Sequence, residues 1–159
     1  MREILFKAKR LDNGEWVEGF YFEFKGETYI AEMRQTFMTT YYTEESVVDF
    51  NMRAYEVEAE TICQYTGLTD KNGNKIWEND IVKCYSFDCS GREVEFISDV
   101  FWDDCSWLLH EEEHCDGMLF YFDKNIKFES HVSEIEVIGN IFDNAELLED
   151  SCTNSRTGN

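Results

Sequence analysis

Residues Gln64 to Lys83, QYTGLTDKNGNKIWENDIVK, decide the fold more than any other stretch of this chain. Asp70-Lys71-Asn72-Gly73-Asn74 is typical of a tight turn with Gly73 at positive φ. A calcium loop needs its glycine at the sixth place, whereas Gly73 stands at the fourth. Asp80-Ile81-Val82-Lys83 then predicts the start of a β-strand. The stretch therefore specifies a backbone path rather than a reaction.

The residues before this stretch predict a three-stranded β-meander. Apolar and polar residues alternate over 4–8 and 16–24, a third strand is expected at 28–30, and turn residues separate them at 12–14 and 25–26. Four aromatic residues of the second strand fall on one face, namely Trp16, Phe20, Phe22 and Phe24. We interpret them as a core stripe, because a base-stacking platform would need a basic groove.

Short strands are expected through the rest of the chain. The pattern predicts a variable connection over 34–46 and a half-buried strand with an acidic outer face over 55–59. Further strands are predicted at 81–85, 94–102, 107–110, 118–122, 127–132 and 135–141, with a turn at 123–125. One short helix is predicted at 144–149, capped by Asp143 or Asn144. This pattern indicates an all-β sandwich or small barrel.

Composition bounds the class of protein. The chain has 159 residues, no proline, 43% apolar and 16% aromatic residues, which fits one globular domain over 1–150 or two β subdomains, about 1–60 and 61–150. The tail, 151–159, is expected to be disordered. The start, MREILFKAKR, is not a signal peptide, and no apolar run is long enough for a membrane helix. We therefore expect a soluble cytoplasmic protein whose six cysteines are thiols.

Charge is the strongest feature of the composition. There are 34 acidic and 14 basic residues, a net charge of −20, and residues 93–116 hold nine acids with no Lys or Arg. A phosphate backbone would repel such a chain, so direct nucleic-acid binding is not expected. The acidic run is either a solvated surface or one presented to a basic partner in imitation of DNA phosphates. The candidate partner-binding residues are Asp103, Asp104, Glu111, Glu112, Glu113 and Asp116.

The same region contains weak metal candidates. His110 to His114 matches H-E-x-x-H, but its two inner positions are both Glu, and its neighbours are predicted strands rather than a zinc-protease helix. A structural zinc site is the alternative, with His110, His114, Cys115 and Cys105 as candidates and Cys84 and Cys89 nearby. The chain has no CxxC pair. We therefore expect solvated histidines and buried or loop cysteines, with no cofactor and no catalytic residue.

Three stretches together resemble the YopX family of phage and prophage proteins. They are MREILFKAKRLDNGEWVEGF at the N-terminus, VEAETICQYTGLTDKNGNKIWENDIVK over 57–83, and EIEVIGNIFDNAELLE over 134–149. Asn79 and Cys63 depart from the family pattern, where Gly is commoner, and Asn tolerates positive φ at such a position. The resemblance implies a mainly β fold with a small SH3-like barrel around the Asp-Ile-Val strand. Together with the N-terminal meander and the one short C-terminal helix predicted from the residue pattern, this is the expected fold class. The resemblance also implies a phage or prophage origin, and it transfers no activity.

The expected function is that of a non-enzymatic accessory protein in the host cytoplasm, acting through protein contacts and as a homo-oligomer through exposed strand edges. The first alternative is an acidic, DNA-mimicking inhibitor of a host nucleic-acid-binding or defence protein. The second alternative is a zinc-binding protein or enzyme.

Overall fold

A computed structural model describes residues 4–39, 46–87, 92–103, 105–110, 117–118 and 134–149. Backbone contacts divide the chain into two compact units, Glu3–Gln64 and Tyr65–Asn159. The fold is mainly β, with antiparallel sheets and one helical turn at residues 146–149, so the predicted fold class is confirmed. Whether residues 1–150 form one domain or two subdomains stays a prediction.

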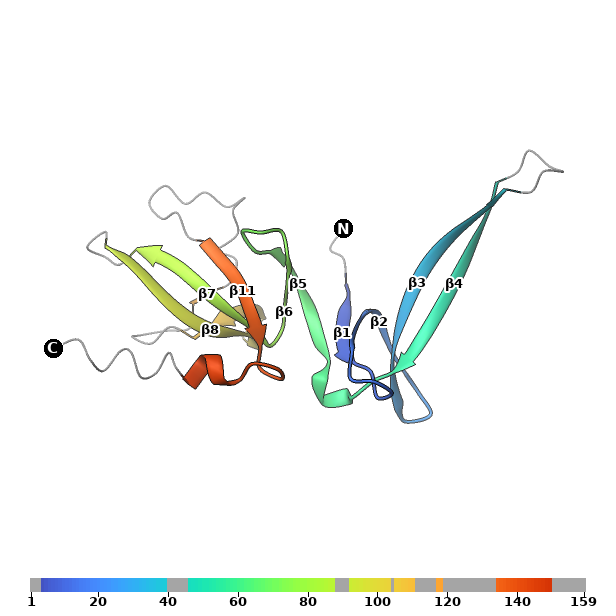
Figure 1. The fold of residues 1–159 in the computed structure, drawn as a ribbon, viewed down its shortest axis with the longest axis horizontal. Helices are drawn as coiled ribbons and strands as arrows, with labels where there is room; N and C mark the ends of the chain where they lie inside the picture. The colour runs from blue at the N-terminus through green and yellow to red at the C-terminus, as the bar shows by residue number, and fades with distance from the viewer. Residues whose placement is uncertain are drawn as a thin grey trace. The chain divides into compact units, whose positions relative to one another are not determined.

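The first unit contains the predicted meander. Its strands are β1 (Phe6–Lys9), β2 (Trp16–Phe24), β3 (Glu27–Thr39) and β4 (Ser46–Glu56), followed by the 3-10 turn η1 (Ala59–Thr61). The strands pair antiparallel in the order β4-β3-β2-β1, and the start of β5 (Cys63–Thr69) lies on the other side of β1 (Figure 1). The hairpin turns fall where they were predicted, with Gly14 at φ 71° and Lys25-Gly26 at φ 54° and 85°.

Two expectations for the first unit are corrected. Residues 34–39 are strand, not part of a variable connection over 34–46, because β3 and β4 pair from Tyr29↔Glu56 to Thr39↔Ser46. No Gly or Pro occurs between Gly26 and Gly67, so nothing in this sequence interrupts the long strands. The strand expected over 55–59 ends at Glu56, because the chain there turns through η1 toward β1.

The core of the first unit lies on one face of this curled sheet. Ala8, Ile30 and Val57 are its buried residues, and Phe6, Val17 and Ile62 pack against them. Val57 bridges back to Arg10, and Glu58 N donates a hydrogen bond to Lys9 O at 2.9 Å. The segment after β4 therefore returns to the end of β1, on the side where β5 also pairs.

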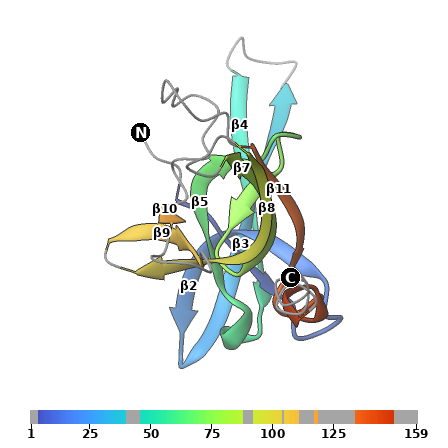
Figure 2. The same ribbon diagram turned by 90° about the vertical axis from the view of Figure 1, so that its left-hand side faces the viewer.

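The second unit is built around a five-stranded antiparallel sheet, β10-β9-β8-β7-β11. Its strands are β7 (Asp80–Phe87), β8 (Glu93–Asp103), β9 (Ser106–Leu109), β10 (Gly117–Met118) and β11 (Glu134–Asn140). β7 pairs with β8 on one side and with β11 on the other (Figure 1), and Figure 2 shows the same strands after a 90° turn. The remainder of β5 pairs with β6 (Lys75–Trp77) across the Asp70–Asn74 turn.

The core of the second unit draws on most of its strands. The buried cluster consists of Ile76, Val82, Cys84, Val100, Trp107, Leu109 and Ile135. The predicted strands around 81–85, 94–102, 107–110 and 135–141 are confirmed as β7, β8, β9 and β11. Of the strand predicted at 118–122, only Met118 is described, in β10. The described pairings form an open sheet, so the SH3-like barrel stays a prediction.

Several predictions fall outside the described residues. They are the strand at 127–132, the turn at 123–125 and the tail at 151–159. The helix predicted at 144–149 is confirmed as a turn at 146–149, where Leu147 N and Leu148 N donate to the carbonyls of Asn144 and Ala145. No helix in the described part of the chain has the length and apolar content that crossing a bilayer requires.

Candidate functional site

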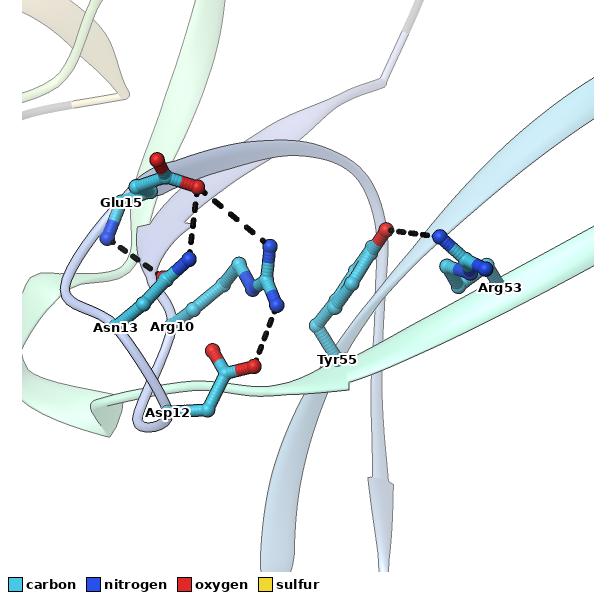
Figure 3. Close-up of polar contacts among 6 residues, drawn as sticks. All are labelled: Arg10, Asp12, Asn13, Glu15, Arg53 and Tyr55. Carbon is cyan, nitrogen blue, oxygen red and sulfur yellow. Dashed lines mark hydrogen bonds and ion pairs between the residues drawn. The ribbon is translucent and has the colours of Figure 1, made fainter.

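Arg10 is at the centre of a polar cluster in the first unit (Figure 3). Its Nη2 lies 2.5 Å from Asp12 Oδ2, and its Nη1 lies 3.7 Å from Glu15 Oε2. The guanidinium stacks 4.2 Å from the centre of the Tyr55 ring. The hydrogen bond to Asp12 is the main reason that the pKa of Arg10 is raised, so the guanidinium stays charged at any physiological pH.

The loop between β1 and β2 holds these carboxylates in place. Asn13 Nδ2 donates to Glu15 Oε2 at 2.7 Å, and Glu15 N donates back to Asn13 Oδ1 at 3.0 Å. Gly14 N also donates to Arg10 O at 2.9 Å. Arg10 is thereby tied to acidic groups of its own loop, and Arg53 Nη1 extends the cluster by donating to Tyr55 Oη at 3.5 Å.

A cavity of about 410 Å³ opens beside this cluster. It is lined by Arg10, Trp16, Val17, Glu18, Glu32 and Tyr55. These six residues include no Ser, Cys or His that could act as a nucleophile. Arg10 Nε is buried and has no hydrogen-bond partner among the described residues. Positive and negative groups share the lining, so its charges do not single out one class of ligand.

The second feature is a sheet face that we call the uncharged ribbon face. Its described uncharged side chains are Phe20, Phe22, Phe24, Tyr29, Ala31, Met52 and Ala54. None of these seven residues is charged, and the register pairs Glu27 with Phe24 and Glu56 with Tyr29 at one end of the same face. A hydrogen bond from Tyr29 Oη to Glu27 is the main reason that the pKa of Tyr29 is raised to about 12, so its phenol stays neutral.

The prediction that the aromatic side chains of β2 form a core stripe is wrong for Phe20 and Phe24. Phe20 is 47% exposed and Phe24 57% exposed, because the core of the first unit lies on the opposite face of β2, with Val17. Trp16 is half-buried and carries the ammonium groups of Lys7 and Lys9 at 5.0 Å and 5.6 Å from its ring centre. Aromatic content alone therefore pointed to the wrong face.

Of the six acidic residues predicted to bind a partner, the structure describes only Asp103. Asp103 ends β8 and is exposed. Asp104, Glu111, Glu112, Glu113 and Asp116 lie outside the described residues. Their role as a partner surface stays a prediction.

The structure describes some of the predicted metal ligands and not others. His110 directly follows β9, stacks on Phe101 at 4.1 Å between ring centres, and has its Nε2 3.7 Å from Asp99 Oδ1. Cys105 is an exposed free thiol, whereas Cys84 is buried in the core of its unit. Cys89, His114 and Cys115 lie outside the described residues. Within the described ranges, no three His, Cys, Asp or Glu side chains gather as metal ligands would.

The stretch Gln64–Lys83 contains a network of hydrogen bonds centred on Asp70. Asp70 is 1% exposed, and its Oδ1 accepts from Asn72 N and Asn74 N, both at 2.8 Å. Its Oδ2 accepts from Asn74 Nδ2 at 3.0 Å and from Val137 N of β11 at 3.2 Å. Gly73 has φ 88°, as the turn chemistry predicted. These contacts fasten the turn to a strand that is distant in sequence.

The second half of the stretch starts strand β7. Trp77 N donates to the buried Asp80 Oδ2 at 2.8 Å. Asn79 has φ 64°, its N donates to Val100 O at 2.7 Å, and its carbonyl accepts from Ile141 N at 3.0 Å. The backbone of Asn79 thus links the strands on both sides of β7.

A family model described as YopX protein matches residues 5–149. The chain belongs to the YopX family. Among solved structures, the crystal structure of protein EF1440 from Enterococcus faecalis is similar to this YopX chain, with a TM-score of 0.55 and 22% identity over 93% of this chain and 99% of that one. At this identity the likeness concerns the fold alone. No curated protein matches the chain.

Both departures from the YopX pattern have a structural account. Cys63 is fully buried, with its Sγ 3.3 Å from Thr61 O, so its side chain fills core space. Asn79 occupies a left-handed position that Asn adopts more readily than most residues. The stretches that resemble the YopX family thus shape the backbone of this chain.

Because Asn79 has a left-handed backbone conformation, substitutions at this position should differ in their effect on the free energy of unfolding. We expect Asn79→Ala to lower the free energy of unfolding by about 1–2 kcal/mol, because a Cβ disfavours this conformation and alanine has no polar group to offset it. Asn79→Gly should cost clearly less, because glycine adopts positive φ freely. Urea unfolding of the two variants checks the order, and equal losses would contradict it.

Proposed function

We propose that this YopX chain is a non-enzymatic phage or prophage accessory protein that acts in the host cytoplasm through protein contacts. The observation that carries the proposal is the exposure of large apolar side chains on the uncharged ribbon face. Phe20, Phe24 and Met52 are 47%, 57% and 68% exposed. Contiguous apolar surface of this kind is a mark of interaction sites.

The exposed apolar area on this face sets how much free energy a partner could gain by covering it. Fully burying one large apolar side chain contributes about 1.5–3 kcal/mol, so covering three half-exposed ones contributes on the order of 3 kcal/mol before the costs of association. Phe22, Ala31 and Ala54 on the same face add to this, since they carry no charge that would have to be desolvated. A protein partner that offers apolar surface gains more here than a hydrophilic ligand.

The uneven distribution of charge favours a second candidate function. Residues 65–159 hold 21 acidic and seven basic residues, against 13 and seven in residues 1–64. An acidic surface of that kind suits an inhibitor that imitates DNA phosphates against a basic host protein. Asp103, Asp104 and Glu111 to Glu113 are the residues of this candidate function.

One capture experiment separates the two candidates. The immobilised chain is exposed to host lysate and washed at low and at high salt. Contacts through the uncharged ribbon face should survive high salt and be lost in Met52→Lys, because apolar burial is not screened. Contacts through the acidic surface should be released by salt and lost when Asp103, Asp104 and Glu111 to Glu113 are made neutral.

The outcomes of the capture are distinct. A partner retained at high salt by wild type and by the acid-neutralised chain, and absent with Met52→Lys, supports the ribbon-face proposal. A partner retained equally by Met52→Lys contradicts it. Near-stoichiometric zinc in untagged protein, measured by metal analysis, would instead favour the zinc-binding alternative.

A further inference from the structure

Two carboxylates lie at one end of the uncharged ribbon face. Glu27 precedes Tyr29 by two residues on β3, and Glu56 of β4 is the Cα partner of Tyr29. Both glutamates are exposed. Glu27 accepts the hydrogen bond of the Tyr29 phenol at 2.6 Å, and the charges of Glu27 and Glu56 both add to the raised pKa of Tyr29. The two carboxylates therefore converge on one side chain of the face.

Neither glutamate has a basic partner within the described ranges. No Lys, Arg or His side chain described by the structure forms an ion pair with Glu27 or Glu56. Lys25 is close in sequence, but its ammonium lies over the Phe24 ring, 5.3 Å from the ring centre. Diagonal neighbours on adjacent strands are about 7–8 Å apart, so one cationic group can contact both carboxylates.

An aromatic stack lies beside these carboxylates. The rings of Phe22 and Tyr29 are stacked, with their centres 5.3 Å apart and their planes at 15°. Phe24, the Cα partner of Glu27, is more than half exposed. The faces of aromatic rings attract cations, and the position of Lys25 over Phe24 is one example on this chain. A cation bound between the two glutamates therefore meets ring faces as well as carboxylates.

Flat rings next to two carboxylates favour arginine over lysine. A guanidinium is planar, stacks on aromatic faces and has five N–H donors, so it can contact two carboxylates at once. The ammonium of lysine is a compact and strongly hydrated charge, which loses more hydration when it is placed against a ring.

The rest of the described face is apolar. Ala31 and Ala54 are Cα partners, and the large exposed side chains of Phe20 and Met52 lie near them. The small alanines leave a low floor between the larger side chains. Ala31 lies four residues after Glu27 on β3, about 13 Å at ~3.3 Å per residue. A ligand that covers the whole face therefore needs a cation at one end and apolar groups at the other.

We infer that the uncharged ribbon face docks a segment of a partner protein that carries an arginine beside a group of apolar side chains. The arginine lies against Glu27, Glu56 and the aromatic stack, and the apolar side chains cover Phe20 and Met52. The inference rests on the proposed function and adds the chemistry of the partner. A second copy of this chain fits less well, because a two-fold contact through this face would bring two more carboxylates to it.

The test is a selection of short random peptides against the immobilised full chain, followed by titration of the selected peptides in solution. We expect these peptides to share an arginine and a group of apolar residues. Glu27→Gln with Glu56→Gln should weaken their binding about fivefold, because the charges are lost while Gln still accepts the hydrogen bond from Tyr29. Glu23→Gln with Glu60→Gln is the matched control, with the same loss of charge at exposed positions on the opposite face of β2 and in η1.

A charge exchange gives a second measurement. A selected peptide whose arginine is replaced by glutamate should bind the wild type more weakly, because like charges then meet. The same peptide should regain affinity for the variant Glu27→Lys with Glu56→Lys. Circular dichroism of each variant confirms folding, and the Gln variants decide the question if the Lys variant unfolds.

Each outcome decides the inference. A selection that enriches no arginine-containing peptide overturns it, as does equal binding by the Glu27→Gln, Glu56→Gln variant and its control. Light scattering that finds a wild-type dimer which Met52→Lys dissociates also overturns it, because a second copy then covers the face. If lysate capture depends on Met52 but peptide binding does not depend on Glu27 and Glu56, the inference fails and the proposed function stands. If Met52→Lys changes neither capture nor peptide binding, both fail.

Discussion

Replacing Gly19 by alanine should lower the free energy of unfolding by about 3 kcal/mol or more, at the upper end of overpacking costs. An ideal Cβ at this position would lie 2.1 Å from Ala31 O and 2.7 Å from Ala31 C. Both are backbone atoms, so no side-chain rotation relieves the collision. Gly19 lies where β2 stops pairing with β1 and starts pairing with β3. The variant therefore should disrupt the sheet of the first unit.

Gly14→Ala is the matched control for this prediction. Gly14 has φ 71° and nothing within 4 Å of its ideal Cβ. Alanine there should therefore lower the free energy of unfolding only by the cost of the left-handed conformation, about 1–2 kcal/mol. Urea unfolding of both variants, followed by far-UV circular dichroism, gives the comparison. If Gly19→Ala loses no more stability than Gly14→Ala, the close approach of β3 to Gly19 is wrong.

Asp70→Ala should cost about 3 kcal/mol, because three backbone N–H groups lose a charged acceptor at once. They belong to Asn72, Asn74 and Val137. Water can reach some of these groups, since Asn72 and Asn74 are exposed, and this limits the loss. Asp103→Ala, at an exposed carboxylate, should change stability by less than about 0.5 kcal/mol.

The contribution of Asp70 should also depend on pH. Burial alone would raise the pKa of its carboxyl, but hydrogen bonds from Asn74, Val137 and Asn72 together outweigh burial and hold the pKa below its ordinary value. A lowered pKa in the folded state stabilises the protein above the ordinary carboxyl pKa of about 4. That stability is lost as the pH falls through the folded-state pKa.

The measurement is the difference in unfolding free energy between wild type and Asp70→Asn at several pH values. Asn keeps the volume of Asp and cannot titrate. We expect the difference to be largest near neutral pH and to shrink on acidification below about pH 4. A difference that stays constant across that range would show that the Asp70 charge is not held by this network.

The candidate site was harder to predict than the strands. Period-two alternation identified β2 correctly, but it could not say which of its two faces meets the core. Phe20 and Phe24 looked like core residues by type, and their exposure followed only from where β3 and the segment around Val57 fold. The absence of charge at the odd positions of residues 29–39 and at the even positions of residues 46–54 is the signal that could have revealed the face.

The sequence by itself determined the mainly β class, the hairpin turns, the YopX membership and the path of residues 64–83. These depend on local chemistry, such as positive φ at Gly73 and Asn79 and two-residue alternation, which a chain carries wherever it folds. Only the tertiary structure decided that Asp70 fastens its turn to Val137, that β3 crosses Gly19, and that the aromatic face of β2 stays exposed. These features join residues far apart in sequence, and pairing partners between distant segments cannot be read from either segment alone.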